Sequence, residues 1–571
     1  MIPFRFPRRL RQAFPSVLLS VLFLAVSANG AAGPVPALSD STPPNHPASA
    51  NDTTGTFLFK TLQNAAAQGD PTAFSLLEAM GTENPSPQSG LREARPWLEE
   101  AASQGHVKAA FLAGVLALSA TPPDCEKALA LLRFAAGKND ADAANELGTL
   151  ARTGTCVKTD WASAREWFST AAGQGHARAQ YNLGMMAYFG RGIARDPEAA
   201  ARWFSQAAQA DLPEAKTALA TLMWKGDGVP LDRQKARTLL EQAAREGDAA
   251  ARFQLGLFYR HGLGVSKDAG AARHCFAQAA EQRHTDAAYQ LALMQFNGEG
   301  GPVEREAALN WFAQAAESGY APAQYTIGYL TLKGDGLPQD AAGAREWFEK
   351  AAAQNDVRAT AALGYLYLNG IGTAPNGRRA ADWFEKAAAQ NDPYAQDQLA
   401  LLLAQGKGVP ADPDRARRWL EKAARQAYAP AQYHLALLLL SDAVPEKKPD
   451  EAVIWLEQSA ANGSADAAHF YAGLLYLGAG IRQNVPKALT YYTRAAEAGN
   501  TEARFILGTL YINGKGVPRD PAKARYWLEA AARDGHPDAP RALAKLDDVL
   551  SKGTNAPSSA PSGPKPPADS P

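Results

Sequence analysis

Cysteine is scarce in this chain of 571 residues, which has only three, and the usual metal-site patterns are missing. The sequence contains neither Cys-x-x-Cys nor His-x-x-x-His, spacings with which zinc sites are commonly built. It also lacks the Gly-x-x-x-x-Gly-Lys loop that holds nucleotide phosphates. We therefore expect a protein with no metal and no other cofactor.

Net charge is also lacking, because 58 basic side chains balance 58 acidic ones. Residues 1–30 hold four Arg and no acidic residue, so their removal would leave a net charge of −4. A nucleic-acid-binding protein needs a basic face, and this balance does not supply one. We expect no nucleic-acid partner.

Only one apolar run stands out, from Val17 to Val26, and it is shorter than the about 20 residues of a transmembrane helix. Four Arg precede it and small residues follow at Ala28, Gly30 and Ala32. This order predicts a signal peptide over residues 1–32 and a periplasmic or secreted protein without stable membrane insertion after processing. An uncleaved anchor is the alternative.

Proline and serine are concentrated at both ends of what remains. This composition cannot bury much apolar surface and predicts a disordered linker at 33–55 and a disordered tail at 551–571.

The chain between these ends is a repeat. An Ala stands three residues before a bulky residue, usually Trp, which is followed by Ala-Ala, and after a first gap of 34 the spacing is always 36. The bulky positions are Trp97, Leu131, Trp167, Trp203, Leu239, Cys275, Trp311, Trp347, Trp383, Trp419, Trp455, Tyr491 and Trp527. A fixed period of this length predicts a solenoid of stacked units.

Each unit predicts two helices, as residues 179–211 illustrate. Leu183 and Gly184 belong to a first helix, which the Gly190-Arg191-Gly192 turn ends. A second helix starts after a capping side chain and carries the bulky residue, so that Trp347, for example, is expected in the core. The predicted caps are Asp160, Asp196, Asp232, Asp268, Asp340, Asn376, Asp412, Asn484 and Asp520.

The pattern A-x-x-x-L-G-x-x-Y-x-x-G-x-G-V…D-x-x-x-A-x-x-W-F-x-x-A-A-x-x-G resembles the Sel-one-like repeat (SLR) family, relatives of the tetratricopeptide repeats. The unit at 503–535 matches it best, and the resemblance covers about residues 57–549. It implies an all-α, right-handed α/α superhelical solenoid of about 13 helix pairs over residues 56–550. The first helix of each pair would line the concave side.

Catalytic motifs are weak when weighed against the repeat. His106, His176, His284 and His536 recur at one repeat position, which is expected of a turn residue and not of a catalytic base. Some SLR proteins are labelled as β-lactamases, but Ser-x-x-Lys occurs here only at Ser562–Lys565, in the predicted tail. We expect no enzyme, with an envelope hydrolase of the β-lactamase-like kind as the alternative.

The cysteines have different expected roles. Cys275 stands where other units have Trp, which predicts a buried free thiol. Cys125 and Cys156 fall between the first and second helices of neighbouring units. In an exported protein they could form a disulfide, and two unpaired loop thiols are the alternative.

Aromatic residues recur on the first helix. One repeat position holds Tyr181, Phe253, Tyr289, Tyr325, Tyr433 and Phe505, and another holds Tyr329 and Tyr365. Alignment with tetratricopeptide units places them toward the concave groove, where Tyr is favoured in binding, although packing between repeats is the alternative. We expect a scaffold or adaptor of the bacterial envelope that binds a protein or peptide along this groove.

Overall fold

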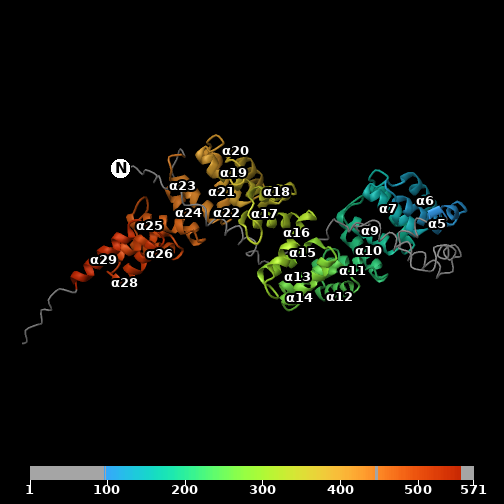
Figure 1. The fold of residues 1–571 in the computed structure, drawn as a ribbon, viewed down its shortest axis with the longest axis horizontal. Coiled ribbons are helices and arrows are strands. Elements are labelled where there is room, and N and C mark those ends of the chain that lie inside the picture. Colours follow the sequence, from blue (N-terminus) through green and yellow to red (C-terminus); the bar gives the residue numbers. More distant parts are fainter. Residues whose placement is uncertain (1–94, 97, 444–447, 554–571) are drawn as a thin grey trace, which may run out of the picture. The chain divides into compact units, whose positions relative to one another are not determined.

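The computed structural model describes residues 95–96, 98–443 and 448–553. The predicted signal peptide, linker, most of the first repeat with Trp97, and nearly all of the tail lie outside the described residues. Throughout the part that is described the chain is helical, with no strand. It divides into two compact units at residues 314 and 315, within helix α16 (Arg305–Glu317), and each unit is described by itself (Figure 1).

The first unit contains the helices numbered from α5. They are α5 Val107–Leu118, α6 Cys125–Gly137, α7 Ala141–Thr153, α8 Trp161–Gly173, α9 Ala177–Phe189, α10 Pro197–Gln209, α11 Pro213–Lys225, α12 Arg233–Arg245, α13 Ala249–His261, α14 Ala269–Glu281 and α15 Thr285–Asn297.

The second unit continues the same alternation. Its helices are α17 Ala321–Lys333, α18 Ala341–Ala353, α19 Val357–Asn369, α20 Gly377–Ala389, α21 Pro393–Gln405, α22 Pro413–Arg425, α23 Ala429–Leu440, α24 Pro449–Ala461, α25 Ala465–Leu477, α26 Val485–Glu497, α27 Thr501–Asn513, α28 Pro521–Arg533 and α29 Ala539–Gly553.

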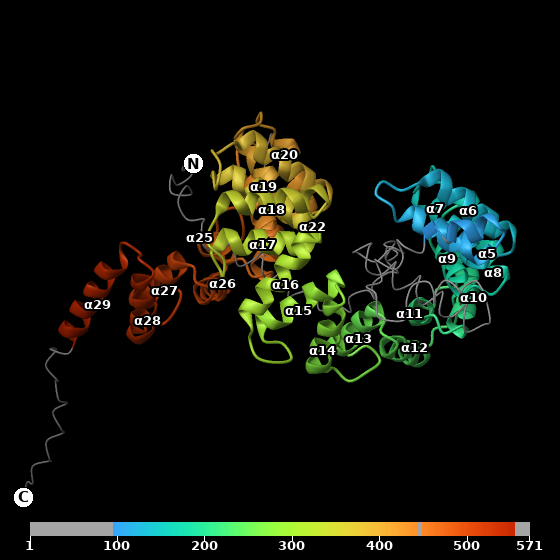
Figure 2. The ribbon, with the colours of Figure 1, turned by 45° about the vertical axis from the view of Figure 1, so that its right-hand side comes forward.

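Odd-numbered helices are the first helices of the pairs and even-numbered ones are the second. Within each unit a first helix packs most extensively on its own second helix, which then packs on the next first helix. Figure 2 shows this succession for α17, α18, α19 and α20 of the second unit. The predicted all-α solenoid of stacked helix pairs is confirmed.

The second helices begin where the sequence predicts. Each predicted Asp or Asn cap accepts a hydrogen bond from a backbone N–H of the first turn, a group that a helix otherwise leaves without a partner. Several first helices are capped in the same way, two of them by histidine. His176 and His284 accept through Nδ1 from Ala179 and Ala287, which explains His at these two turns, whereas His106 makes no capping hydrogen bond with its side chain.

The Gly-x-Gly turn between the two helices needs both glycines, for different reasons. Gly190 ends α9 in the left-handed conformation at φ 70°, which costs glycine little. The second glycine is illustrated by Gly228, in the turn between α11 and α12, which has φ 73°. It lies directly against Pro197, the first residue of α10 in the preceding pair. A methyl group there would overlap the carbonyl group of Pro197, so this turn also fixes how one pair sits on the previous one.

The core of a pair forms where a bulky side chain of the second helix meets a small residue of the first. A methyl group on Gly184 would lie 2.5 Å from Phe204 Cε1, so the ring occupies the space that glycine leaves. Five pairs have Gly facing Phe, namely 148 and 168, 184 and 204, 256 and 276, 328 and 348, and 364 and 384. Three pairs have Ala with Leu at the same positions, namely 220 and 240, 400 and 420, and 436 and 456. In these eight pairs the two sites compensate in volume. Four pairs do not follow this rule, namely Gly114 and Leu132, Ala292 and Phe312, Ala472 and Tyr492, and Gly508 and Leu528.

The expectation that Trp347 fills the core is wrong. Trp347 is only half-buried, whereas the next residue, Phe348, is 1 % exposed. Successive residues on a helix point about 100° apart, and it is Phe348 that faces Gly328. The indole of Trp347 lies at the edge of the pair instead, with Lys350 Nζ 4.1 Å from its ring centre.

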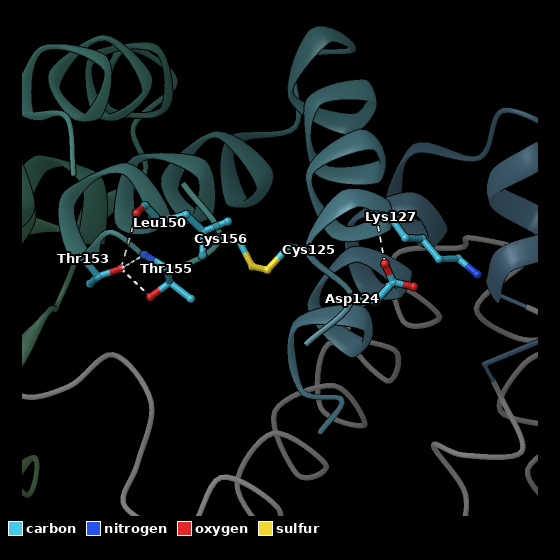
Figure 3. The surroundings of a disulfide bond; sticks show 7 residues. All are labelled: Asp124, Cys125, Lys127, Leu150, Thr153, Thr155 and Cys156. Atoms are coloured by element: carbon cyan, nitrogen blue, oxygen red, sulfur yellow. Dashed lines mark hydrogen bonds between the residues drawn. A yellow bond between two sulfur atoms is a disulfide. The ribbon is translucent and has the colours of Figure 1, made fainter. Parts of the chain in front are cut away.

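Cys125 and Cys156 form a disulfide with their Cα atoms 5.1 Å apart, an ordinary separation for such a bond (Figure 3). Cys156 follows α7, as expected, but Cys125 is the first residue of α6 and does not lie in the connection before it. The bond joins two successive helix pairs. Cys275 is free and half-buried, so it is less enclosed than the sequence suggests.

Gly184→Ala should destabilise the α9–α10 pair by about 1–3 kcal/mol, because the added methyl group meets the Phe204 ring. Phe204→Leu in the same chain should recover part of this loss, since Ala with Leu occurs naturally at 220 and 240. The measurement is a double-mutant cycle on urea unfolding. Strictly additive losses would contradict the proposed compensation.

Phe348→Ala should cost about 3–5 kcal/mol, as expected for removing a fully buried ring, whereas Trp347→Ala should cost less because the indole is half-exposed. Hydrogen exchange of α17 and α18 measures both losses locally, because a solenoid unit is coupled mainly to its neighbours. A larger loss of protection for Trp347→Ala would show that the indole, and not Phe348, holds the pair together.

Thiol labelling of protein purified from its natural source, and unfolded without a reducing agent, should find one reactive cysteine, Cys275. Replacing both Cys125 and Cys156 by Ser should lower stability by about 3 kcal/mol, because the closed loop restricts the unfolded chain. Cys275→Ser serves as the control that leaves the disulfide intact. Three reactive thiols in the native protein would refute the pairing.

Candidate functional site

Each first helix has a face that its own second helix does not cover. Because a residue turns by about 100°, helix positions 2, 6, 9 and 13 lie on one side. In α21 these are Tyr394, Gln398, Leu401 and Gln405, all half-buried or exposed. We call the surface made by these positions the first-helix face.

Some neighbouring first helices contact each other directly, so their faces adjoin. Direct contacts join α11 to α13 in the first unit, and α19 to α21 and α21 to α23 in the second. Over the described residues no two second helices contact each other as extensively. The first helices thus form the closer-packed side of each stack, and their face is the candidate binding surface.

Four of the eight aromatic residues predicted to line a groove are core residues. Tyr181, Phe253, Tyr289 and Tyr325 occupy helix position 5 and are each less than 10 % exposed. Their rings lie 5.6–5.8 Å from Phe204, Phe276, Phe312 and Phe348 of their own second helices. The packing alternative left open by the sequence describes these four side chains.

The other four predicted residues are half-buried. Tyr329 and Tyr365 occupy helix position 9 and lie on the first-helix face. Tyr433 contacts the Phe470 ring, and Phe505 stacks on the His536 imidazole with ring centres 4.0 Å apart. Tyr329 and Tyr365 are therefore the predicted aromatics that are best placed to touch a partner.

The first-helix face differs in chemistry between the two units at position 6, whereas position 9 is mostly apolar and uncharged in both. In the first unit position 6 is mostly polar, with Glu146, Asn182, Gln254 and Gln290. In the second unit both positions are mostly apolar and uncharged. They hold Thr326 and Tyr329, Ala362 and Tyr365, Gln398 and Leu401, His434 and Leu437, Phe470 and Gly473, and Ile506 and Thr509.

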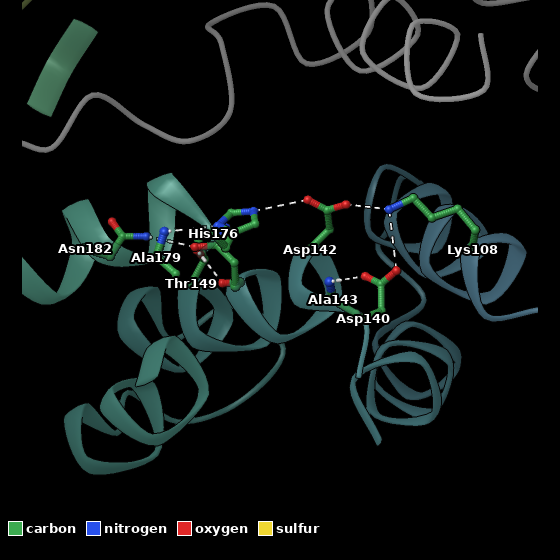
Figure 4. A network of polar contacts seen from close by, with 9 residues as sticks. Lys108, Asp140, Asp142, Ala143, Thr149, His176, Ala179 and Asn182 are labelled. Atoms are coloured by element: carbon green, nitrogen blue, oxygen red, sulfur yellow. Dashed lines mark hydrogen bonds and ion pairs between the residues drawn. The ribbon is translucent and has the colours of Figure 1, made fainter. Parts of the chain in front are cut away.

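One group of polar side chains in the first unit forms a network across three first helices. Asn182 Nδ2 donates to Asn145 Oδ1 at 3.1 Å, and His176 Nε2 lies 3.1 Å from Asp142 Oδ1 (Figure 4). Lys108 also pairs with Asp142. The His176 hydrogen bond and the Lys108 ammonium hold the pKa of Asp142 well below its usual range, although burial opposes this. This network ties α5, α7 and α9 together.

One polar pair in the second unit interrupts the aromatic pattern, and the sequence analysis missed it. Position 5 of α21 is Asp397, which is 1 % exposed, where most units have an aromatic residue. His434 of α23 approaches it with Nδ1 2.7 Å from Asp397 Oδ1. Gln398 Nε2 donates to the other carboxylate oxygen at 3.2 Å.

The ionisation of this pair is set by opposing effects. Burial alone would lower the pKa of His434, but the charge and hydrogen bond of Asp397 and the charge of Asp466 outweigh it, and the net pKa is raised. The charged imidazolium form is therefore favoured. Asp397 could have been noticed in the sequence, because it stands at helix position 5, where most units have an aromatic residue. Its partner could not be found in the same way, because His434 lies 37 residues further on, at position 6 of its own helix.

Tyr394 compensates for a second irregularity nearby. Position 5 of α19 is Ala361, so the core ring of Phe384 lacks its usual aromatic neighbour. Tyr394 of the next first helix takes this place, with ring centres 5.9 Å apart. Its hydroxyl is enclosed and has no hydrogen-bond partner among the described residues. Burial raises the pKa of Tyr394 far above its usual value, so the phenol stays neutral.

The described residues also bear on two other functions, metal binding and membrane insertion. Across residues 95–443 and 448–553, residue 97 apart, no three His, Cys, Asp or Glu side chains gather closely enough to hold a metal ion. None of the helices described there has the length and apolar character needed to cross a membrane. The first-helix face of the second unit therefore combines apolar contact area with His434, whose ring is held by Asp397.

Comparisons with known proteins agree with this architecture. A family model of the Sel1 repeat matches thirteen consecutive segments between residues 83 and 536. The crystal structure of a protective antigen of uropathogenic Escherichia coli, which displays an SLR fold, is 28 % identical with a TM-score of 0.59, over 76 % of this chain and 99 % of that one. A Sel1 repeat protein from Oxalobacter formigenes is 34 % identical, over 57 % of this chain and 93 % of that one, with a TM-score of 0.41.

A search among curated proteins finds no match. The family assignment rests on the repeat model, which accounts for far more than half of the residues, in the same 36-residue segments that the helix pairs occupy. The chain belongs to the Sel1 repeat family.

Proposed function

We propose that this Sel1 repeat protein is a non-catalytic scaffold of the bacterial envelope, periplasmic or secreted, that binds a protein or peptide along its first-helix face. Sel1 repeats form solenoids, whose extended surfaces commonly mediate protein interactions. One observation carries the proposal for this chain. In the second unit positions 6 and 9 of successive first helices form a half-exposed, largely apolar surface that the fold itself does not cover.

The proposed location outside the cytoplasm is supported by the order of basic, apolar and small residues at 1–32 and by the disulfide. The similar protein from uropathogenic Escherichia coli is a protective antigen, which suits the same location. No observation favours the hydrolase alternative, whose Ser562 and Lys565 lie outside the described residues.

The test captures partners from an envelope extract of the source bacterium on three forms of the mature chain. Tyr329→Ala with Tyr365→Ala should lose a partner that the unchanged protein retains, because both rings lie on the first-helix face. Lys350→Glu with Lys386→Glu should retain it, because these exposed residues belong to second helices. Mass spectrometry identifies the partner, and circular dichroism confirms that helical content is unchanged.

Loss of the partner from the second-helix variant alone would overturn the assignment of the binding face. Location is measured separately by N-terminal sequencing of the native protein, which should start near residues 29–33. Recovery of intact Met1 in the soluble cytoplasmic fraction would contradict export.

A further inference from the structure

The middle of the second unit carries a strip without any formal charge except one histidine. It consists of Tyr365 on α19, Gln398 and Leu401 on α21, and His434 and Leu437 on α23, all half-buried. These three first helices contact one another in sequence, so the side chains lie on adjoining faces. We call this surface the neutral strip.

His434 is held in one orientation on this strip. Its Nδ1 bonds to the buried Asp397 carboxylate, whose second oxygen is occupied by Gln398. Nε2 is on the opposite edge of the ring, and among the described residues it has no hydrogen-bond partner and is not sealed from solvent. A ring that is fixed at one nitrogen presents the other one without further loss of side-chain freedom.

The charged groups around His434 favour a donor at Nε2. Asp397 faces the ring from α21 and Asp466 acts from α25, while Tyr433 and Tyr428 on its own segment are neutral phenols. Both carboxylates stabilise the imidazolium, in which each ring nitrogen carries a proton. Nε2–H can then donate to an oxygen of a bound partner.

The rest of the strip constrains what that partner can be. A charged side chain laid on Tyr365, Leu401 and Leu437 would lose water, which is costly. It would meet no net countercharge, because Asp397 already neutralises the His434 imidazolium. Backbone carbonyl oxygens of an uncharged peptide can accept from His434 without that cost. Packed helices are about 8–10 Å apart, and a polyproline II peptide repeats its side chains every about 9 Å, at every third residue.

We infer that the neutral strip binds an uncharged, polyproline-II-like peptide segment with an apolar side chain at every third residue, one of whose backbone carbonyls accepts a hydrogen bond from His434 Nε2. This inference rests on the proposed scaffold function and names the chemistry of its partner. Tyr365, Leu401 and Leu437 supply apolar contact on three successive helices. His434 sets the position of the peptide along them.

The probe is a fluorescein-labelled acetyl-(Leu-Pro-Ala)₄-amide, and its binding to the full mature chain is measured by fluorescence anisotropy. Affinity should fall as pH rises through the raised folded pKa of His434, because deprotonation removes the Nε2 donor. His434→Gln can still donate to Asp397, so it should fold, but it should bind about tenfold more weakly at pH 6. It should also lose the pH dependence.

Matched variants test the place of binding. Leu401→Lys puts a charge on the neutral strip and should abolish binding, whereas Leu293→Lys makes the same change at position 9 of α15 in the first unit and should not. A peptide with Glu or Lys in place of each Ala, and acetyl-(Leu-Ala)₆-amide with apolar residues at every position, should bind more weakly.

Absence of binding by the unchanged protein, equal effects of the two Leu→Lys variants, or affinity independent of pH would each overturn the inference. These failures are distinct from failure of the scaffold function. If Tyr329→Ala with Tyr365→Ala still loses a captured envelope protein while the probe does not bind, the scaffold proposal stands and the peptide chemistry is wrong.

Discussion

The contact between a small residue of the first helix and a bulky residue of the second determines how close the two helices of a pair can lie. Where the small residue is Gly, as at Gly184, the facing ring lies where a side chain would start. Where it is Ala, the facing residue is usually Leu, as for Ala220 and Leu240. This contact sets how one helix pair is presented to the next, while the side chains of the first-helix face can differ from pair to pair.

Local signals made most of the fold predictable from sequence. Asp196 as a cap, Pro197 after it and Gly190 at the end of the preceding helix each act within one turn, and they lie where expected. The choice of core residue failed because Trp347 and Phe348 are adjacent, bulky and apolar. Both positions recur with the same 36-residue period, so the period cannot distinguish them. Packing against the partner helix decides that Phe348 is the one that is buried.

The candidate site was predicted less well, for a related reason. Helical spacing correctly placed Tyr325 and Tyr329 on the same helix, but one packs on Phe348 and the other lies on the exposed side. The Asp397–His434 pair depends on how neighbouring first helices are aligned, which no single unit encodes. Both errors concern relations between helices, where tertiary packing overrides the pattern within one helix.

The second glycine of each turn has a further consequence for how such a chain changes over evolutionary time. Gly228 rests on the start of the preceding second helix at Pro197, and Gly408 does the same five units further along at Gly377. Where consecutive joints are built in this way, a duplication or deletion of one 36-residue block would join ends that already fit. Gene length can then vary by whole blocks. A surface such as that around His434 can move nearer to or farther from either terminus without a new packing arrangement between helix pairs.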